Sequence, residues 1–169
     1  MISNIDLRYR TAKLFNKVIH MSNVDAILQL AQKRATDNSF PYAGALTPRE
    51  TFELLQESPE VVLVDVRTQA ELELVGRVPN VMSLEWATYP GMVKNQDFAK
   101  QLADKVDKNL TVIFMCRTGG RSHNAAVLAE QLGFDKAYNM LEGFEGEANE
   151  LKQRTLINGW KHAGLPWTN

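Results

Sequence analysis

Short apolar runs alternate along this chain with longer segments whose apolar residues have helical spacing. Four of the runs are too short for a buried helix: Val61–Val66, Val81–Trp86, Val112–Met115 and Lys136–Leu141. Runs of this length are typical of strands that are buried on both faces. Strands that alternate with helices of about ten residues predict βαβ units. The pattern therefore favours an α/β fold with a parallel sheet.

Capping signals and spacing place the helices between these runs. Thr47–Glu50 is a capping box with proline at the first helical position, and its helix is expected to end near Ser58. Thr68–Glu71 is a second capping box, opening a short helix that Gly76 closes. A third helix is predicted around Asp97–Val106. A fourth follows the third strand, because apolar residues recur there at i, i+3, i+4 and i+7: Ala125, Leu128, Ala129 and Leu132.

The first 41 residues are predicted to be an N-terminal extension that precedes the main domain, residues 42–169. Residues 1–20 form a basic leader, with four basic residues and one acidic residue. It lacks the continuous apolar stretch of a secretory signal, so a short basic helix, or an upstream start with Met21 opening the protein, is favoured over a targeting peptide. An amphipathic helix is predicted at about 24–35. We expect this helix to pack on the domain that follows or on a second subunit. Its apolar face consists of Val24, Ile27, Leu28, Ala31 and Ala35.

Composition narrows the function classes. A chain of 169 residues with 44% hydrophobic composition suffices for one globular domain with a short appendage. A net charge of −1 does not indicate a nucleic-acid-binding protein, and no apolar run is long enough to span a membrane. The single cysteine, Cys116, excludes an internal disulfide and suits a reducing, cytoplasmic location. Oligomeric state stays open.

The only cysteine lies in the loop between the third strand and the fourth helix. Parallel sheets bind ligands at the carboxyl ends of their strands, and Cys116 is at such an end. The positive end of a helix dipole and free backbone N–H groups meet there, and both favour a thiolate. Arg117 and Arg121 add positive charge to the loop, and Thr118 and Ser122 add hydroxyl donors. Gly119 and Gly120 can adopt a positive φ, which lets the backbone close around an anion.

Two other interpretations of this loop compete with a reactive thiolate. A lone cysteine is usually a small buried hydrophobe, but an inert one needs neither two arginines nor two consecutive glycines after it. A loop that only binds phosphate would leave the cysteine without a role. Ser122 is either a donor to the site or simply a residue of the first helical turn. The loop favours an activated cysteine nucleophile.

Four motifs, in order along the chain, resemble those of the rhodanese (thiosulfate sulfurtransferase) family. The match covers about residues 43–167 once, which implies a single-domain form whose parallel sheet has helices on both faces. The first motif is Val64–Arg67, with Glu71 in the helix that follows, and the second motif is Gly76–Val81. The active-site loop is Cys116–Arg121, and the C-terminal signature is Gly159–Trp167.

The resemblance implies an enzyme of the thiosulfate sulfurtransferase type, in which Cys116 accepts a sulfane sulfur as a persulfide and passes it to a nucleophile. It implies a small sulfur-donor anion, an acceptor that is a thiol, cyanide or a protein, and no metal or organic cofactor. Residues 117–121 would form an amide cradle that Arg121 closes electrostatically. Asp65 and Arg67 would support the carboxyl edge of the sheet, or form only a surface salt bridge.

Two alternative functions stay open. One is a sulfur-carrier or redox-sensing module that docks on a partner protein through the predicted helix at Val24–Ala35. The other is a small-anion phosphatase or arsenate reductase. Loop length disfavours it, because the related loops of such enzymes place an arginine one residue later, where this chain has Ser122.

Several positions outside the loop carry weaker expectations. Arg77 and Asn80 stand where the family's second motif usually has histidine and glycine. The polar insertion Glu147–Asn158 is expected to form a surface loop or short helix, either beside the active-site mouth or simply solvated. Tyr89 and Met92 are candidates for a pocket wall. The three histidines show no metal-ligand spacing, and His123 is expected at an exposed helix position.

Overall fold

The computed structural model describes residues 22–169, so the predicted basic leader at residues 1–20 lies outside the described residues. The helices are α2 (Asn23–Asp37), α3 (Pro48–Glu57), α4 (Gln69–Leu74), α5 (Phe98–Lys105) and α6 (Gly120–Gln131). The strands are β1 (Gly44–Leu46), β2 (Val61–Asp65), β3 (Met82–Ser83), β4 (Ala87–Thr88), β5 (Val93–Lys94), β6 (Thr111–Met115) and β7 (Ala137–Met140). Within residues 22–169, no helix has the length and apolar character needed to cross a membrane.

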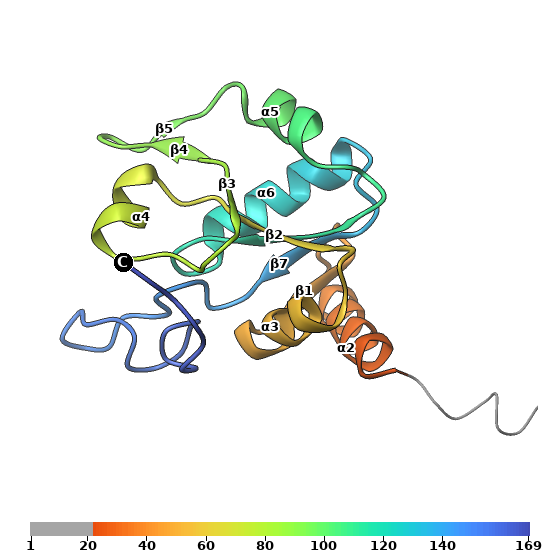
Figure 1. The fold of residues 1–169 in the computed structure, drawn as a ribbon, viewed down its shortest axis with the longest axis horizontal. Helices are drawn as coiled ribbons and strands as arrows, with labels where there is room; N and C mark the ends of the chain where they lie inside the picture. The colour runs from red at the N-terminus through yellow and green to blue at the C-terminus, as the bar shows by residue number, and fades with distance from the viewer. Residues whose placement is uncertain (1–21) are drawn as a thin grey trace, which may run out of the picture.

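Five strands form a parallel sheet in the order β1-β7-β6-β2-β3, with β6 at its centre (Figure 1). Every residue of β6 is buried. Its side chains alternate between two core clusters, since Val112 and Phe114 belong to one and Ile113 and Met115 to the other. Both faces of the central strand are therefore covered, as its continuous apolar run predicts.

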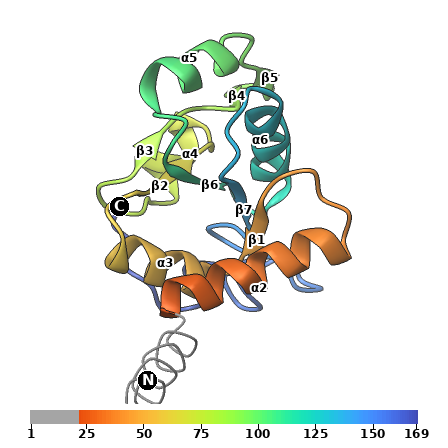
Figure 2. The same ribbon diagram turned by 90° about the vertical axis from the view of Figure 1, so that its right-hand side faces the viewer.

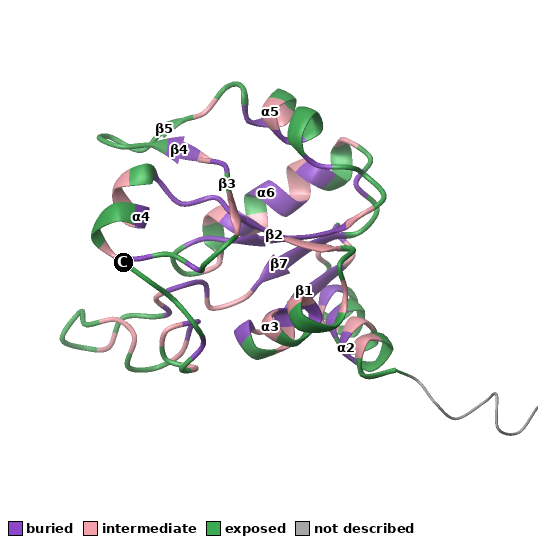
Figure 3. Cartoon of the chain, in the orientation of Figure 1, coloured by how far each residue is buried: buried purple, intermediate pink, exposed green. Residues whose placement is uncertain are grey.

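Helices cover both faces of this sheet: α5 and α6 lie on one side, and α2 and α3 lie on the other (Figures 1 and 2). Phe98 and Leu102 of α5 pack in the first core cluster, and Leu54 of α3 packs in the second. Buried positions concentrate on the central strands and on the sides of the helices that face them (Figure 3). The predicted α/β fold with a parallel sheet and helices on both faces is confirmed.

The helix α2 packs directly on the domain. A capping box of Ser22 and Asp25 starts the helix, and its buried residues are Ile27, Ala31 and Ala35. The neighbouring strand β1 has glycine at Gly44, where a Cβ atom would lie 2.9 Å from the backbone of Ala31. The apolar face of α2 is thus buried against the domain, which is one of the two packings that the sequence left open. The domain boundary after residue 41 stays a prediction.

Two segments differ from, or refine, the sequence-based expectation. The strand predicted over Val81–Trp86 is only Met82–Ser83, because the chain turns away into the antiparallel hairpin β4–β5. Its amides still bond the end of β2, since Leu84 N–H donates to Asp65 O at 2.9 Å. The insertion Glu147–Asn158 contains no helix or strand and is a loop held by turns.

Two substitutions in α2 test whether this helix is part of the core. Ile27→Ala removes a side chain that is 8% exposed and should lower the free energy of unfolding by about 2–4 kcal/mol. Leu30→Ala is the matched control on the same helix, because Leu30 is 46% exposed, and it should cost under about 1 kcal/mol. Urea unfolding measures both. Equal, small losses would show that α2 is not an integral part of the domain.

Candidate functional site

The cysteine loop leaves the carboxyl end of the central strand β6. The strand places Met115 opposite Asp65 of β2, and Val66 N–H donates to Met115 O at 2.8 Å. On the other side, Phe144 N–H donates to Cys116 O at 2.8 Å. Backbone bonds on both sides therefore fix the start of the loop, while its far end runs into the first turn of α6.

The sulfur of Cys116 lies among hydrogen-bond donors. Gly119 N–H donates to Sγ at 3.2 Å, and the Ser122 hydroxyl donates to it at 3.4 Å. Cys116 is a free cysteine and is 1% exposed, and Ser122 is fully buried. Ser122 therefore donates to the site from the first turn of α6, so it has both of the roles that the sequence left open, whereas Thr118 is exposed. A backbone amide and a hydroxyl at these positions can both donate to a negatively charged sulfur.

Only one of the two loop glycines uses the positive φ that a glycine can adopt. Gly119, the N-cap of α6, has a φ of 99°, which a residue with a side chain adopts only at a cost. Gly120 is the first helical residue and is not among the positive-φ positions. A Cβ atom at Gly120 would meet nothing within 4 Å. Gly120 therefore does not need a positive φ, because it already belongs to α6.

Arg121 fastens the loop to α4. Its Nη1 and Nη2 donate to the two carboxylate oxygens of Glu71 at 2.7 and 2.6 Å. Glu71 also accepts hydrogen bonds from the N–H and hydroxyl of Thr68, each at 2.9 Å, as part of the predicted capping box. We had assigned Arg121 as the cation that closes the loop electrostatically, but its charge is paired with Glu71. Sequence reasoning had recognised Glu71 only as a motif and capping residue.

The pair shifts the titration of both partners. Burial acts to raise the pKa of Glu71, but the hydrogen bonds and charge of Arg121, with the bonds from Thr68, outweigh it and lower this pKa to about 2. Burial acts to lower the pKa of Arg121, and the bonds and charge of Glu71 outweigh that effect and raise it. The pair is therefore fully ionised at neutral pH.

Arg117 differs from Arg121 in having an exposed side chain. Its backbone carbonyl accepts the N–H groups of Glu145 and Gly146 at 3.0 and 3.3 Å, so its main chain is held in place. Its guanidinium has no hydrogen-bond or ion-pair partner among residues 22–169. Arg117 is thus the cation of the loop that is available to a ligand.

Asp65 and Arg67 form a buried ion pair under the site. Arg67 Nη2 donates to Asp65 Oδ2 at 2.7 Å and to the carbonyl of Gly76 at 2.9 Å. The two side chains are 2% and 0% exposed, which excludes a surface salt bridge. The Arg67 guanidinium also stacks 3.9 Å from the ring centre of Phe144. The pair thus connects the first motif to Gly76 of the second motif. It also contacts Phe144, whose N–H donates to the Cys116 carbonyl.

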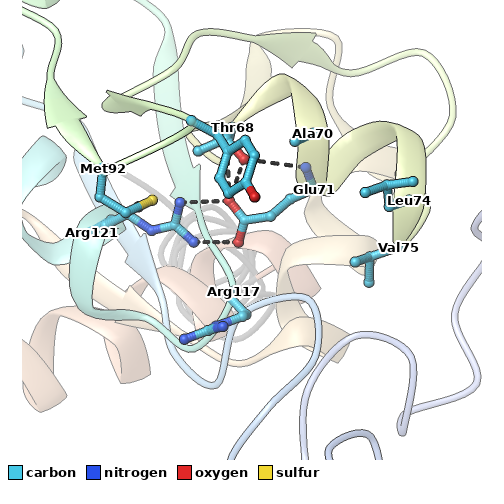
Figure 4. A pocket seen from close by; sticks show the side chains of 10 residues that line it. Thr68, Ala70, Glu71, Leu74, Val75, Met92, Arg117 and Arg121 are labelled. Carbon is cyan, nitrogen blue, oxygen red and sulfur yellow. Dashed lines mark hydrogen bonds and ion pairs between the residues drawn. The ribbon is translucent and has the colours of Figure 1, made fainter.

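A cavity of about 430 Å³ opens beside the loop (Figure 4). Arg117 and Arg121 line it on the loop side, and Cys116 itself does not line it. One face of α4 and the end of the hairpin form the rest of the wall: Thr68, Ala70, Glu71, Leu74, Val75, Tyr89, Gly91 and Met92. Tyr89 and Met92 thus lie where we expected a pocket wall. The face of α4 was missed, although Ala70, Glu71, Leu74 and Val75 have the i, i+1, i+4, i+5 spacing of one helix face.

His123 lies outside this cavity, and the expectation for it is wrong. It is half-buried, with Nδ1 2.8 Å from the hydroxyl of Tyr42, and its ring packs edge-on against Phe40. Burial raises the pKa of Tyr42, to about 12, against a smaller effect of its hydrogen bond with Asn139. The first turn of α6 is covered by Phe40 and Tyr42, which helix periodicity alone does not predict.

Comparisons with known proteins identify the family of this chain. Residues 48–150 match the rhodanese-like domain family. RC0915 of Rickettsia conorii, an uncharacterized protein, is 31% identical over 70% of this chain and 91% of its own length. The thiosulfate sulfurtransferase GlpE of Actinobacillus succinogenes is 32% identical over 72% of this chain and 86% of its own.

A solved structure gives the same result. The crystal structure of Rv0390 from M. tuberculosis is 41% identical in sequence, covers 75% of this chain and 98% of that one, and has a TM-score of 0.70. The fold and the site define a class of α/β protein, in which a cysteine loop follows the central strand of a parallel sheet. The chain belongs to the rhodanese-like domain family.

The bond between Arg121 and Glu71 predicts a pH-dependent stability. Because the pKa of Glu71 falls from its ordinary value to about 2 on folding, ionised Glu71 stabilises the protein above about pH 4.5. This contribution is lost as the pH falls toward 2. Glu71→Gln should lower the free energy of unfolding by about 1–2 kcal/mol at pH 7, and this difference from the unsubstituted protein should shrink between pH 5 and pH 3.

Urea unfolding at a series of pH values measures this difference. Glu73→Gln, at an exposed position of the same helix, is the control and should change stability little at any pH. A loss for Glu71→Gln that is the same at pH 7 and pH 3 would contradict the prediction.

Proposed function

We propose that the protein is a sulfurtransferase of the thiosulfate type that carries sulfur as a persulfide on Cys116. The observation that carries this proposal is the position of Sγ, between the N–H of Gly119 and the hydroxyl of Ser122 at the start of α6. Membership of the rhodanese-like domain family, and relatives named sulfurtransferases, support it.

The first half-reaction loads the cysteine. The Cys116 thiolate attacks the outer sulfur of thiosulfate and forms a new S–S bond. The original S–S bond of thiosulfate breaks, and its electron pair leaves with sulfite. The negative charge then lies on the outer sulfur of the persulfide, next to the donors that held the thiolate.

The second half-reaction returns the cysteine to its first state. A nucleophile, either cyanide or a thiolate, attacks the outer persulfide sulfur, and the electron pair of the broken S–S bond returns to Cys116. The products are thiocyanate or an acceptor persulfide. A protein thiol is an equally suitable acceptor in chemical terms. Since the described part of the chain holds one cysteine, Cys116, the acceptor comes from outside this segment.

The site supports sulfur transfer over phosphatase or arsenate-reductase chemistry. A phosphate or arsenate is attacked at its central atom, so the whole tetrahedral group must enter the loop, whereas thiosulfate is attacked at its terminal sulfur and its oxygens can stay outside. Here Ser122 lies buried against Sγ at the place of the later arginine, and Arg121 is occupied by Glu71. Because Cys116 is 1% exposed, a slender terminal sulfur atom suits the approach to Sγ better than a bulky tetrahedral group.

A docking module that only carries sulfur is less well supported. This alternative takes the helix at Val24–Ala35 as its docking surface, and the apolar face of that helix, with Ile27 and Ala31, is buried in the domain core. A cytoplasmic location remains part of the proposal, and it rests on the unpaired cysteine.

Loading with thiosulfate tests the proposal. Intact-mass measurement after incubation should show one added sulfur atom on the unsubstituted protein and none on Cys116→Ser. Cyanide should remove that atom as thiocyanate. Ser122→Ala should load about ten-fold more slowly, because a hydroxyl that donates to the charged sulfur is lost.

Two results would count against the proposal. An adduct that persists in Cys116→Ser would place the chemistry elsewhere. No adduct on the unsubstituted protein with any sulfane donor would reject a persulfide carrier altogether. Unchanged urea unfolding of Ser122→Ala serves as the control that its slower loading is not a folding defect.

A further inference from the structure

The segment Gly143–Gly146, which follows β7, lies between the cysteine loop and the insertion Glu147–Asn158. Its first residue packs directly on the loop, since a Cβ atom at Gly143 would lie 2.5 Å from the amide nitrogen of Thr118. Its last residue packs on the insertion, since a Cβ atom at Gly146 would clash with the backbone of Asn158. The insertion is therefore coupled to the cysteine loop through this one segment.

Two carbonyl groups of the cysteine loop are held by this segment. Cys116 O accepts the N–H of Phe144 at 2.8 Å. Arg117 O accepts the N–H groups of Glu145 and Gly146 at 3.0 and 3.3 Å. The negative ends of two successive peptide dipoles of the loop thus face the segment, where N–H groups neutralise them.

The same two peptides have N–H groups that face the other way. They are trans peptides, whose C=O and N–H groups point in opposite directions. The N–H groups of Arg117 and Thr118 therefore point away from the segment. The next N–H group, that of Gly119, donates to Sγ at 3.2 Å. Successive N–H groups on one side of a loop form a concavity that favours an anion, and the bonded carbonyls keep the loop in this orientation.

The segment is itself held from behind. Each of its four carbonyl groups accepts a hydrogen bond from residues 154–161, at 2.8 to 3.1 Å. In order along the segment, the donors are the N–H groups of Trp160, Lys161 and Thr155 and the guanidinium of Arg154. The first two donors belong to the C-terminal signature, and the last two belong to the insertion. The insertion therefore fixes the half of the segment that bonds Arg117 O.

Arg154 is the one side chain among these four donors. Its Nη1 donates to Gly146 O at 2.8 Å, and the side chain is half-buried. The neighbouring Thr155 N–H donates to Glu145 O at 2.8 Å, so the two bonds together clamp Glu145 and Gly146. A bond from a charged guanidinium is stronger than one between neutral groups. A substitution of Arg154 removes this bond without removing any main-chain donor.

We propose that Arg154 of the insertion is a positioning residue for the cysteine loop. Through Gly146 it holds two N–H groups against the Arg117 carbonyl, and so keeps the loop amides oriented for a charged sulfur. The inference rests on the proposed function and deepens it, because the charge that it serves is that of the Cys116 thiolate and its persulfide. It gives a segment outside the four motifs a part in the reaction.

Arg154→Met tests the inference, because methionine keeps an unbranched side chain but has no donor. The second-order rate of loading by thiosulfate, followed by intact mass on the full chain, should fall by about five-fold or more, since small misplacements of reacting groups are costly. The pH profile of Cys116 alkylation by iodoacetamide should shift to higher pH, because misaligned amides favour the charged sulfur less. Arg154→Lys, which keeps a charged donor, should recover part of both effects.

Two control variants separate positioning from a general loss of stability. Lys152→Met removes an exposed cation of the same insertion and should leave the loading rate and the alkylation profile unchanged. Ile27→Ala destabilises the domain from α2 and should load at the rate of the unsubstituted protein. Arg154→Gln makes a smaller change and should shift both measurements in the same direction as Arg154→Met. It takes the place of that variant if urea unfolding shows that Arg154→Met does not fold.

The outcomes distinguish the inference from the function on which it rests. Unchanged loading and an unchanged alkylation profile in Arg154→Met would overturn the inference and leave the sulfurtransferase proposal standing. Equal slowing in Lys152→Met or Ile27→Ala would also overturn it, since the effect would not come from the bond to Gly146. Failure of thiosulfate to load the unsubstituted protein would count against the proposed function, whereas the alkylation profile needs no sulfur transfer and would still test the role of Arg154.

Discussion

The buried pair of Asp65 and Arg67 is the interaction on which the site depends. Two charges removed from water are costly unless their hydrogen bonds are satisfied, and here most of them are. Arg67 bonds both carboxylate oxygens of Asp65 and the carbonyl of Gly76, and it stacks on Phe144. Only its Nη1 has no partner among residues 22–169. The end of β2, the segment at Gly76 and the segment at Phe144 must therefore hold their positions together. Since Phe144 N–H bonds the carbonyl of Cys116, the pair determines where the cysteine loop begins.

Local chemistry made much of the fold and the loop predictable. The capping boxes at Thr47 and Thr68 start helices in the structure, and the apolar run of β6 is buried on both faces, because these signals act over a few residues. The loop was recognisable for the same reason, since a cysteine, two glycines and two arginines are adjacent in the sequence. The strand predicted over Val81–Trp86 was too long, because its end is determined by a hairpin that packs elsewhere.

Features that depend on partners distant in sequence were not predictable. Arg121 lies fifty positions from Glu71, and nothing local shows that its charge is paired. His123 looked exposed from helix periodicity, yet Phe40 and Tyr42 cover it from a segment before β1. The cavity wall combines α4 with the β4–β5 hairpin, so only the tertiary structure brings Leu74 close to Met92. These long-range contacts affect the chemistry of the loop directly. The pairing of Arg121 with Glu71 leaves Arg117 as the cation of the loop that is available to a ligand.

Burial of the cysteine has a consequence for a carrier of sulfur. Gly119 and Ser122 donate to Sγ, and Cys116 is 1% exposed. On the proposed chemistry, loading adds one sulfur atom and moves the negative charge outward by one bond. The loaded atom is then the one that an acceptor meets, whereas the thiolate left after transfer is again enclosed. Because Cys116 is 1% exposed, the empty thiolate would on this chemistry be less accessible to large oxidants and electrophiles than the outer sulfur of the persulfide.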